Sequence, residues 1–260
     1  MSAALLEATD LRKSWAARGR SVMALKEVSL AVAPGETLGL VGRSGCGKST
    51  LARVLTRLTP PQSGAIRFRG EDWLALSGAA LRTARRHMQM VFQDPLGAFN
   101  PRATVAGALA DPLRIHDLVP PARRAARIDE LLERVGLTAD YARRSILELS
   151  GGQRQRVAIA RALACEPSLI VLDEAVSALD VSVRARILDL LVDLQREHGL
   201  AYIFVSHDLA AVKAVSHRIA VMEAGEIVEE GPTDAVVDHP QSPAARALIA
   251  AVPRLIREKP

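Results

Sequence analysis

A glycine-rich segment that directly follows an apolar run restricts most strongly what this chain can fold into. The apolar run is 37–41 (TLGLV), and the segment 42–49 reads GRSGCGKS. The segment fits the pattern G-x-x-x-x-G-K-[ST], in which glycines let consecutive backbone N–H groups point at phosphate oxygens. A chain of this composition contains roughly 0.002 such matches by chance. Because a helix is expected over 48–58, the order of strand, loop and helix predicts a phosphate-binding loop.

Each residue type in this loop has a physical role in holding phosphate. Lys48 is expected to reach the β- and γ-phosphates, and Ser49 to offer its hydroxyl to Mg²⁺. Cys46 has two interpretations, a thiolate favoured by the N–H groups of the loop or a small side chain that lines it. A glycine-rich turn without a ligand is the alternative for the whole segment. The predicted cofactor-binding residues here are Gly42, Arg43, Ser44, Gly45, Cys46, Gly47, Lys48, Ser49 and Thr50.

A second apolar run, 169–172, ends in two carboxylates, Asp173 and Glu174. In a chain that carries a phosphate-binding loop, Asp173 is placed to hold Mg²⁺ directly or through water. Glu174 can accept a proton from the water that attacks the γ-phosphate, which makes it the candidate catalytic base. The alternative is a strand that ends in two solvated acids.

The segment 149–153 (LSGGQ) comes at the start of another expected helix, 153–164. Two glycines are poor helix formers, but they suit a helix start where the backbone must approach a ligand. Ser150, Gly151, Gly152 and Gln153 are therefore candidates for a second anion site. The alternative is an ordinary helix start in which Ser150 is the N-cap residue.

The order of strand-like and helix-like segments predicts an α/β fold. A hairpin is expected within the first 40 residues, where apolar residues alternate with small or polar ones. From 95 to 148 the pattern changes to helical spacing, which indicates an α-helical insert. Strands and helices then alternate, as in a mostly parallel sheet. The other expected elements are strands 64–70, 88–93, 169–173 and 201–206, helices 153–164 and 184–197, and a hairpin of 218–225 with 226–231.

Composition narrows the classes of protein to which the chain can belong. Its 260 residues, 49% of them hydrophobic, can bury a large core, and two cysteines are too few for a disulfide framework. The net charge of +5 raises the question of a nucleic-acid partner, but an aromatic content of 3% argues against base stacking. We expect neither a secretory signal nor a membrane span, because no long apolar run is present. The six histidines are scattered, so no transition-metal site is expected.

Taken in this order, the glycine-rich loop, LSGGQ and LDE resemble the nucleotide-binding subunits of ATP-binding cassette (ABC) transporters. The resemblance covers essentially the whole chain. It implies a P-loop NTPase cassette with a RecA-like core, an N-terminal antiparallel β-subdomain and an inserted α-helical subdomain. Gln93 matches the Q-loop, and SALD, which ends at Asp180, matches the D-loop. His207 matches the catalytic switch histidine that contacts the γ-phosphate, and Trp15 the aromatic residue that stacks on adenine.

The resemblance also implies cofactors and partners. The cofactors are ATP and Mg²⁺, with the ion held by Ser49, Gln93 and Asp173. Two cassettes are expected to close head to tail, so that ATP lies between one P-loop and residues 150–152 of the other. The second cassette is another copy of this chain or a sister ATPase. Closure would drive two transmembrane permease subunits, supplied by a periplasmic solute-binding protein, from the cytoplasmic face of the inner membrane. No nucleic acid is expected as a partner.

The resemblance divides the chain into three parts. The core comprises about 1–94 and 149–230, the helical insert about 95–148, and a C-terminal docking tail about 231–260. The tail is similar to that of the peptide/nickel importer group, as is the stretch VFQDPLGAFNPRATV around Gln93. Ser242, Ala244 and Ala245 depart from the residues usual in that group, so the role of the tail is left open.

The substrate is suggested by two residues that follow the predicted base. Most of the peptide/nickel group has Pro-Thr there, whereas Ala175 and Val176 resemble the nickel-import ATP-binding subunit. Nickel(II) import is therefore the first expectation, and dipeptide or oligopeptide import is the alternative. A soluble ABC protein that acts on DNA or ribosomes is less favoured, because it needs a second cassette or a long insertion. A nucleotide sensor would lack the catalytic Glu, and an exporter role stays open.

Overall fold

The computed structural model describes residues 4–17 and 20–251, whose strands form two sheets. Residues 1–3, 18–19 and 252–260, the last of which belong to the expected docking tail, lie outside the described residues. The strands are β1 (Leu6–Ala17), β2 (Arg20–Val32), β3 (Thr37–Val41), β4 (Ser63–Phe68), β5 (Glu71–Asp72), β6 (Met88–Val91), β7 (Leu169–Asp173), β8 (Ala201–Val205), β9 (Arg218–Glu223) and β10 (Glu226–Pro232). The α-helices are α1 (Lys48–Leu55), α2 (Gly78–Arg85), α3 (Val105–Ile115), α4 (Arg124–Arg134), α5 (Gly151–Leu163), α6 (Val181–His198), α7 (Leu209–Val215), α8 (Thr233–Asp238) and α9 (Pro243–Ala250).

The larger sheet has the strand order β10-β9-β3-β8-β7-β6 and is parallel except for β10. Every residue of β3, β7 and β8 is buried, as expected for strands whose two faces are both covered. The carboxyl ends of the parallel strands meet at one edge. Ligands of open α/β sheets bind at that edge, so it is the place where the functional residues are expected.

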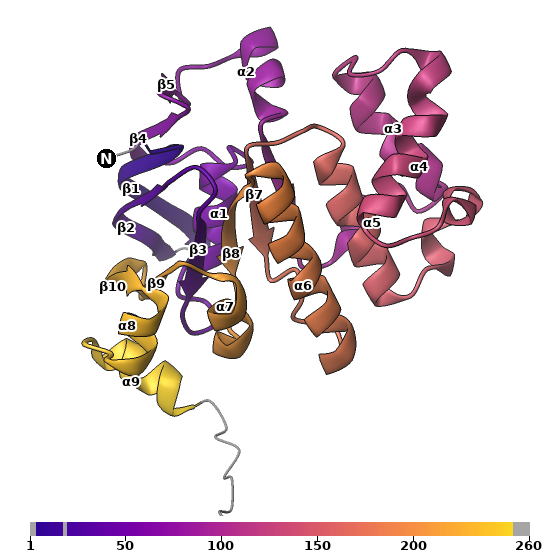
Figure 1. The fold of residues 1–260 in the computed structure, drawn as a ribbon. Helices are drawn as coiled ribbons and strands as arrows, with labels where there is room; N and C mark the ends of the chain where they lie inside the picture. Colours follow the sequence, from indigo (N-terminus) through magenta and orange to yellow (C-terminus); the bar gives the residue numbers. More distant parts are fainter. Residues whose placement is uncertain (1–3, 18–19, 252–260) are drawn as a thin grey trace, which may run out of the picture.

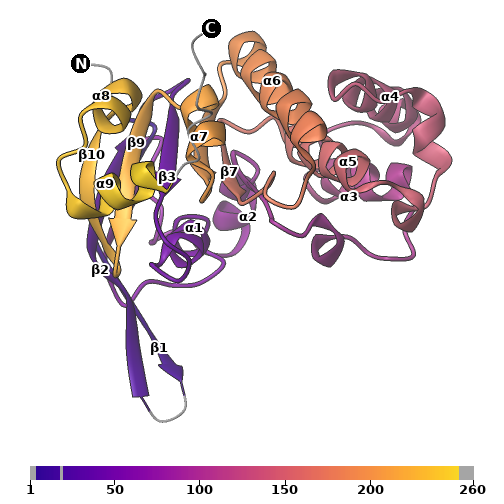
Figure 2. The ribbon, with the colours of Figure 1, turned by 90° about the horizontal axis from the view of Figure 1, so that it is seen from below.

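The N-terminal strands form the antiparallel hairpin that the alternating pattern predicts. β1 pairs with β2 on one side and with β4 on the other, which gives the smaller sheet its order β2-β1-β4-β5. Leu6, Leu11 and Leu25 of this sheet are fully buried, in one cluster with Leu51 and Leu55 of α1. Figure 2 shows part of the β1 and β2 strands projecting from the body of the molecule.

The segment from 95 to 148 is helical. Besides α3 and α4 it contains short 3-10 helices at 95–98, 121–123, 139–143 and 146–148. Leu109, Leu113, Leu131 and Leu132 are fully buried and share a core with α5. Figure 1 shows the smaller sheet on one side of the molecule and α3 and α4 on the other, with the larger sheet between them. The expected α/β cassette fold with its N-terminal β-sheet and helical insert is confirmed.

Three helix boundaries differ from the predicted ones by more than one residue. Helix α1 ends at Leu55 instead of 58, because Arg57 takes a left-handed φ of 55°. Helix α6 starts at Val181 instead of 184, since the Asp180 side chain caps it there. Helix α5 starts at Gly151 instead of 153, with Ser150 as its N-cap. Side-chain capping thus placed two helix starts earlier than hydrophobic spacing predicts. Helix α2 is not predicted from the sequence.

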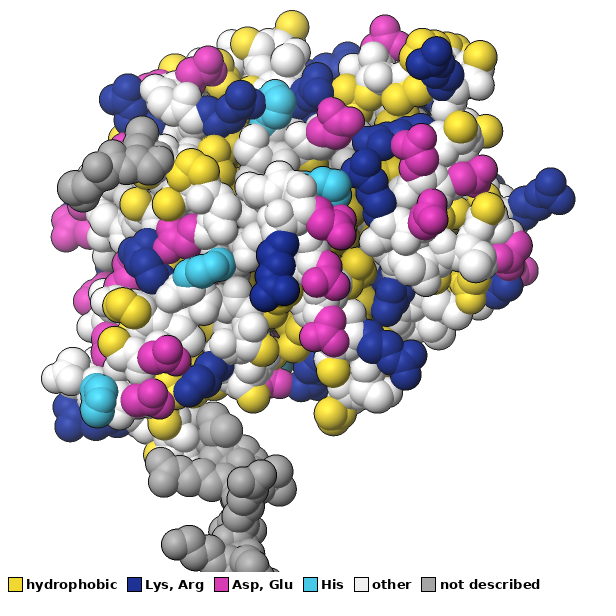
Figure 3. Space-filling model, viewed as in Figure 1, with side chains coloured by type: hydrophobic (Ala, Val, Ile, Leu, Met, Phe, Trp, Pro, Cys, Tyr) yellow, Lys and Arg dark blue, Asp and Glu magenta, His cyan; other side chains and the backbone are white. Residues whose placement is uncertain are grey.

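Charges of both signs are mixed over the surface. Figure 3 shows Lys and Arg side chains interspersed with Asp and Glu on the face that it displays, with no single basic stripe. The net charge of +5 is therefore not gathered there into the kind of patch that follows a nucleic-acid backbone. No helix within the described ranges has the length and apolar character needed to cross a membrane.

Candidate functional site

The glycine-rich loop after β3 lies against the backbones of two other strands, β9 and β2. Gly42 has a φ of 156°, and a Cβ there would lie 2.2 Å from the carbonyl oxygen of Met222. Gly47 has a φ of 114°, and its Cβ would lie 2.4 Å from the carbonyl oxygen of Ala24. Since both contacts are with backbone, neither position accepts a larger residue. The tip of the loop, Arg43, Ser44 and Gly45, is exposed.

Lys48 reaches back into the centre of this loop. Its Nζ donates to the carbonyl oxygens of Gly42 at 2.8 Å and Arg43 at 3.1 Å, and it lies 3.8 Å from Cys46 Sγ. Lys48 is only 4% exposed, so its charge is largely withdrawn from water. A buried ammonium at a helix N-terminus attracts an anion strongly. Cys46 is buried beside it, and Thr50 is half-buried in the first turn of α1.

Ser49 and Asp173 meet at the position predicted for Mg²⁺. Ser49 Oγ donates to Asp173 Oδ1 at 2.9 Å. Burial raises the pKa of the Asp173 carboxyl, the hydrogen bond from Ser49 lowers it, and the neighbouring Glu174 raises it. A hydroxyl and a carboxylate are oxygen ligands of the kind that Mg²⁺ takes together with phosphate and water. Because a cation would offset the cost of ionising buried Asp173, the two residues fit the ion.

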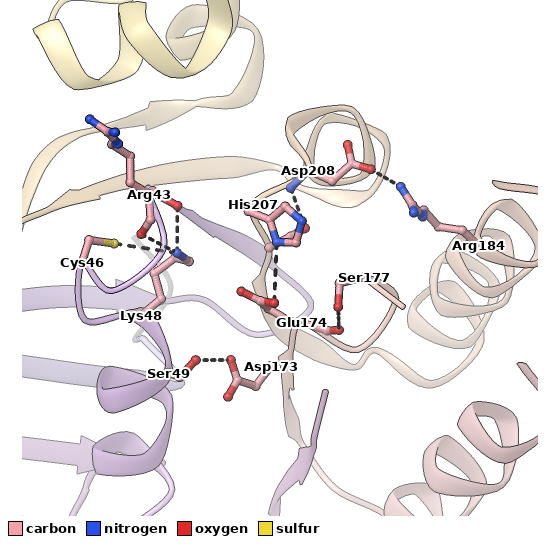
Figure 4. A network of polar contacts seen from close by, with 12 residues as sticks. Arg43, Cys46, Lys48, Ser49, Asp173, Glu174, Ser177, Arg184, His207 and Asp208 are labelled. Carbon is pink, nitrogen blue, oxygen red and sulfur yellow. Dashed lines mark hydrogen bonds and ion pairs between the residues drawn. The ribbon is translucent and has the colours of Figure 1, made fainter. Parts of the chain in front are cut away.

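Glu174 leaves the end of β7 in a strained conformation. Its φ is 49°, in the left-handed region, and its N–H donates to the carbonyl oxygen of Val205 at 3.0 Å. Strain of this kind persists where the surroundings impose it, and it is concentrated at functional sites. Glu174 Oε2 lies 3.6 Å from His207 Nδ1, and Figure 4 shows the two side chains facing each other beside Lys48 and Asp173.

The turn that follows Glu174 is the predicted D-loop. Ser177 Oγ donates to the carbonyl oxygen of Glu174 at 2.9 Å, which closes the turn. Asp180 accepts a hydrogen bond from the backbone N–H of Val183 at 3.0 Å and so caps α6. That N–H and the hydroxyl of Ser182 both lower the pKa of the Asp180 carboxyl.

The residues of LSGGQ form the start of α5. Ser150 and Gln153 build a capping box, in which Ser150 Oγ accepts from the Gln153 N–H at 3.3 Å and Gln153 Oε1 from the Ser150 N–H at 3.0 Å. Gly152 packs against α6, because a Cβ there would lie 2.4 Å from Val183 Cγ1. Gly151 and Ser150 are exposed. In the described part of the chain Gly152 therefore packs against α6 and Gly151 lies near Leu179, and an anion site at this helix start stays a prediction.

Gln93 and Trp15 are both exposed. Val91 of β6 pairs with Leu172 of β7, so Gln93 follows β6 at the edge of the sheet where β7 ends. Trp15 lies in the projecting hairpin opposite Val22, with Lys13 Nζ 4.9 Å from the centre of its ring. Neither side chain is hydrogen-bonded to the P-loop within the described residues. Their predicted contacts with Mg²⁺, water and adenine stay predictions.

The structure thus brings Lys48, Ser49, Asp173, Glu174 and His207 together at the carboxyl edge of the sheet, and it leaves the start of α5 and the hairpin apart from them. It also contains a pair of charged residues that the motifs do not single out.

That pair is Arg184 of α6 and Asp208, which follows His207 and caps α7. Asp208 could have been found as the N-cap after a buried strand. Arg184 has no comparable signal in the sequence.

A model of one protein family matches residues 25–177, and its description is ABC transporter. The chain belongs to the ABC transporter family. The cassette is 53% identical over 234 residues to the glutathione import ATP-binding protein GsiA of Escherichia coli strain K12. It matches the protein of that name from Shigella flexneri at the same identity. Each match covers 90% of this chain and 38% of the relative, so the chain spans well under half of these relatives.

Solved structures of ABC proteins superpose on most of the cassette. The structure of cbiO1 from Clostridium perfringens, described as part of the transporter complex cbiONQ, has a TM-score of 0.79 at 28% identity and covers 91% of each chain. The ATP-binding cassette MJ0796, a dimer in a post-hydrolysis state bound to ADP and Pi, has a TM-score of 0.78 at 28% identity. That match covers 88% of this chain and 98% of the other.

Proposed function

We propose that this cassette hydrolyses ATP to power an ABC import complex. The observation that carries the proposal is the convergence of a buried ammonium, a hydroxyl–carboxylate pair and a second carboxylate beside an imidazole at one edge of the sheet. Binding of a nucleotide and its hydrolysis need these groups and little other chemistry from the protein, since phosphoryl transfer depends mainly on positioning and charge stabilisation.

Each residue of this edge has a role that follows from its contacts. Lys48 exchanges the carbonyl oxygens of its own loop for the β- and γ-phosphates. Ser49, Asp173 and Gln93 would hold Mg²⁺, which neutralises charge on the phosphates when it is bound. Glu174 accepts a proton from the attacking water, and His207 contacts the γ-phosphate. The left-handed φ of 49° at Glu174 turns this carboxylate out of β7 toward the imidazole.

The site of one chain is completed by a second cassette. Gly152 packs against Val183 of α6, and Ser150 and Gly151 are exposed. A helix start that is free of its own nucleotide can close on the nucleotide of a partner. The dimeric cassette MJ0796, bound to ADP and Pi, supports this arrangement. The partner is a second copy or a sister ATPase.

The cargo that the relatives support best is a short peptide. The 53% identity to a glutathione import protein favours the peptide alternative over nickel(II), which rests on Ala175 and Val176 alone. In this proposal the cassette sits on the cytoplasmic face of the inner membrane against two permease subunits, and a periplasmic solute-binding protein supplies the cargo.

Phosphate release by the purified chain, alone and with its permeases in proteoliposomes, tests the proposal. We expect hydrolysis that requires Mg²⁺ and rises when the solute-binding protein is loaded with cargo. Glutathione, a mixture of dipeptides and Ni²⁺ are offered in separate assays. Stimulation of ATP hydrolysis by glutathione or dipeptides supports peptide import. Stimulation by Ni²⁺ alone overturns the peptide hypothesis in favour of nickel import. Absence of ATP hydrolysis in every assay would refute the proposed function.

A further inference from the structure

Arg184, in the first turn of α6, contacts both the D-loop and the segment that carries His207. Its Nη1 forms an ion pair with Asp208 Oδ2, and its Nη2 donates to the carbonyl oxygen of Leu179 at 3.1 Å. The charged side chains of Arg184 and Asp208 are 26% and 27% exposed. Figure 4 shows this pair on the side of His207 that faces away from Lys48. Arg184 therefore joins two loops from behind the reacting edge.

Asp208 fixes the backbone on the C-terminal side of His207. Its N–H donates to Ser206 Oγ at 3.0 Å, and its Oδ1 accepts from the N–H groups of Ala210 at 2.9 Å and Ala211 at 3.2 Å. Both carboxylate oxygens are thus occupied, one by the start of α7 and the other by Arg184. The position of His207, between Ser206 and Asp208, depends on these bonds.

At its other end the same arginine holds the D-loop turn that touches LSGGQ. The hydrogen bond from Arg184 restrains the Leu179 carbonyl group. The side chain of Leu179 in turn faces the start of α5, since a Cβ on Gly151 would lie 3.6 Å from Leu179 Cδ2. The residue before Arg184, Val183, packs against Gly152. A displacement of the start of α5 would therefore reach Arg184 through packed side chains and through the Leu179 carbonyl.

The pair is poorly suited to a purely stabilising role. Arg184 Nε is buried and finds no hydrogen-bond partner in the described part of the chain. A buried polar atom without a partner costs stability, and an ion pair whose side chains are about a quarter exposed contributes little. A group retained at such a cost needs an explanation other than stability.

From these contacts we infer that Arg184 is a positioning residue, which holds His207 over Glu174 by tying Asp208 to the D-loop turn. Through Leu179 and Val183 the same tie makes the position of His207 depend on the start of α5. In the proposed function that helix start binds the nucleotide of a partner cassette. Arg184 thereby links the state of one nucleotide site to the catalytic residues of the other.

Kinetics of four variants in the complete transport complex test the inference. Arg184→Met and Asp208→Asn each break the tie, Arg184→Lys keeps a charge for Asp208, and Arg186→Met changes an exposed arginine of the same helix. We expect Arg184→Met to lower kcat about tenfold or more, because small displacements of catalytic groups cost rate steeply. The Kd for ATP should stay within about twofold, since Lys48 is untouched. Arg184→Lys should recover part of the rate, and Arg186→Met should match the wild type.

A double variant and hydrogen exchange complete the test. If Arg184 acts through Asp208, the double variant Arg184→Met/Asp208→Asn loses no more rate than the worse single variant. Exchange should speed up at the amides of Ala210 and Ala211 in Arg184→Met but not in Arg186→Met, with no hydrolysis needed for this readout. Wild-type kcat in Arg184→Met, or fully additive losses, would overturn the inference while the proposed function stands. If the wild type itself fails to hydrolyse ATP, the proposed function is refuted. Hydrogen exchange still tests the contact between Arg184 and Asp208 in that case, and unchanged exchange at Ala210 and Ala211 in Arg184→Met would reject it.

Discussion

At the scale of single residues, the chemistry of this site rests mainly on groups whose role is set by their immediate neighbours in the chain. Lys48 and Ser49 are such groups, because the glycines around them shape the loop that they serve. Asp173 and Glu174 follow from the end of an apolar strand. Arg184 could not be predicted, since its partner Asp208 is 24 residues away and the two meet only when α6 packs beside α7.

Replacing Lys48 by methionine keeps the length of the side chain and removes its charge. We expect Lys48→Met to weaken binding of a non-hydrolysable ATP analogue by roughly 10- to 100-fold, because a hydrogen bond to a charged group contributes about 1.5–3 kcal/mol. Isothermal titration calorimetry measures the change. Lys213→Met, which alters a half-exposed lysine paired with Asp234 and Asp238, is the control and should bind like the wild type. Equal affinities for both variants would contradict the role of Lys48.

Cys165 gives a prediction about pH. Burial raises the pKa of its thiol from 9.0 to about 11, against the opposing effect of Arg86 and Arg161. Because the folded state holds the proton more tightly than the unfolded state, the associated stability is present below pH 9.0 and is lost as the pH rises toward 11. Between these limits the free energy of unfolding of the wild type should fall by roughly 2 kcal/mol more than that of Cys165→Ala. Urea unfolding at a series of pH values measures both, and parallel curves would contradict the burial argument.

At the scale of elements, helix starts depend on capping side chains that hydrophobic spacing does not detect. Asp180 and Ser150 both place the first turn of their helices earlier than the apolar pattern predicts. The contact between α5 and α6 is also not predicted from the sequence, because Gly152 is interpreted there as part of an anion site. In the structure it is equally a close-packing position against Val183.

Adding a methyl group at Gly152 should therefore disturb this helix contact. A Cβ would lie 2.4 Å from Val183 Cγ1, so we expect Gly152→Ala to lower the free energy of unfolding by about 1–3 kcal/mol. Val183→Ala in the same chain should restore part of the loss by making room. Gly107→Ala is the matched control, since its Cβ would meet nothing closer than 3.5 Å within a helix. Chemical denaturation of the wild type, the two single glycine variants and the double variant measures their free energies of unfolding. A Gly152→Ala variant as stable as the wild type would contradict the predicted contact.

At the scale of the whole molecule, the alternation of strands and helices predicts the class of fold but not the order of the sheet. β3 lies between β8 and β9, which come more than 150 residues later in the chain. No local pattern encodes pairing at that distance, and the resemblance to ABC cassettes implied the kind of core without giving the order of its strands. The helical insert is different, because the spacing that predicts it is local, and α3 and α4 lie within the segment where helices are expected.

The central claim is that this edge of the sheet hydrolyses ATP with Glu174 as the base. The most direct measurement is the rate of phosphate release from MgATP by the wild-type complex and by Glu174→Gln, prepared side by side. A side-chain base contributes about 10²- to 10⁴-fold, so the variant should retain at most about 1% of the wild-type rate. It should still bind ATP, because Lys48, Ser49 and Asp173 are intact. A Glu174→Gln variant that hydrolyses ATP at the wild-type rate would contradict the account.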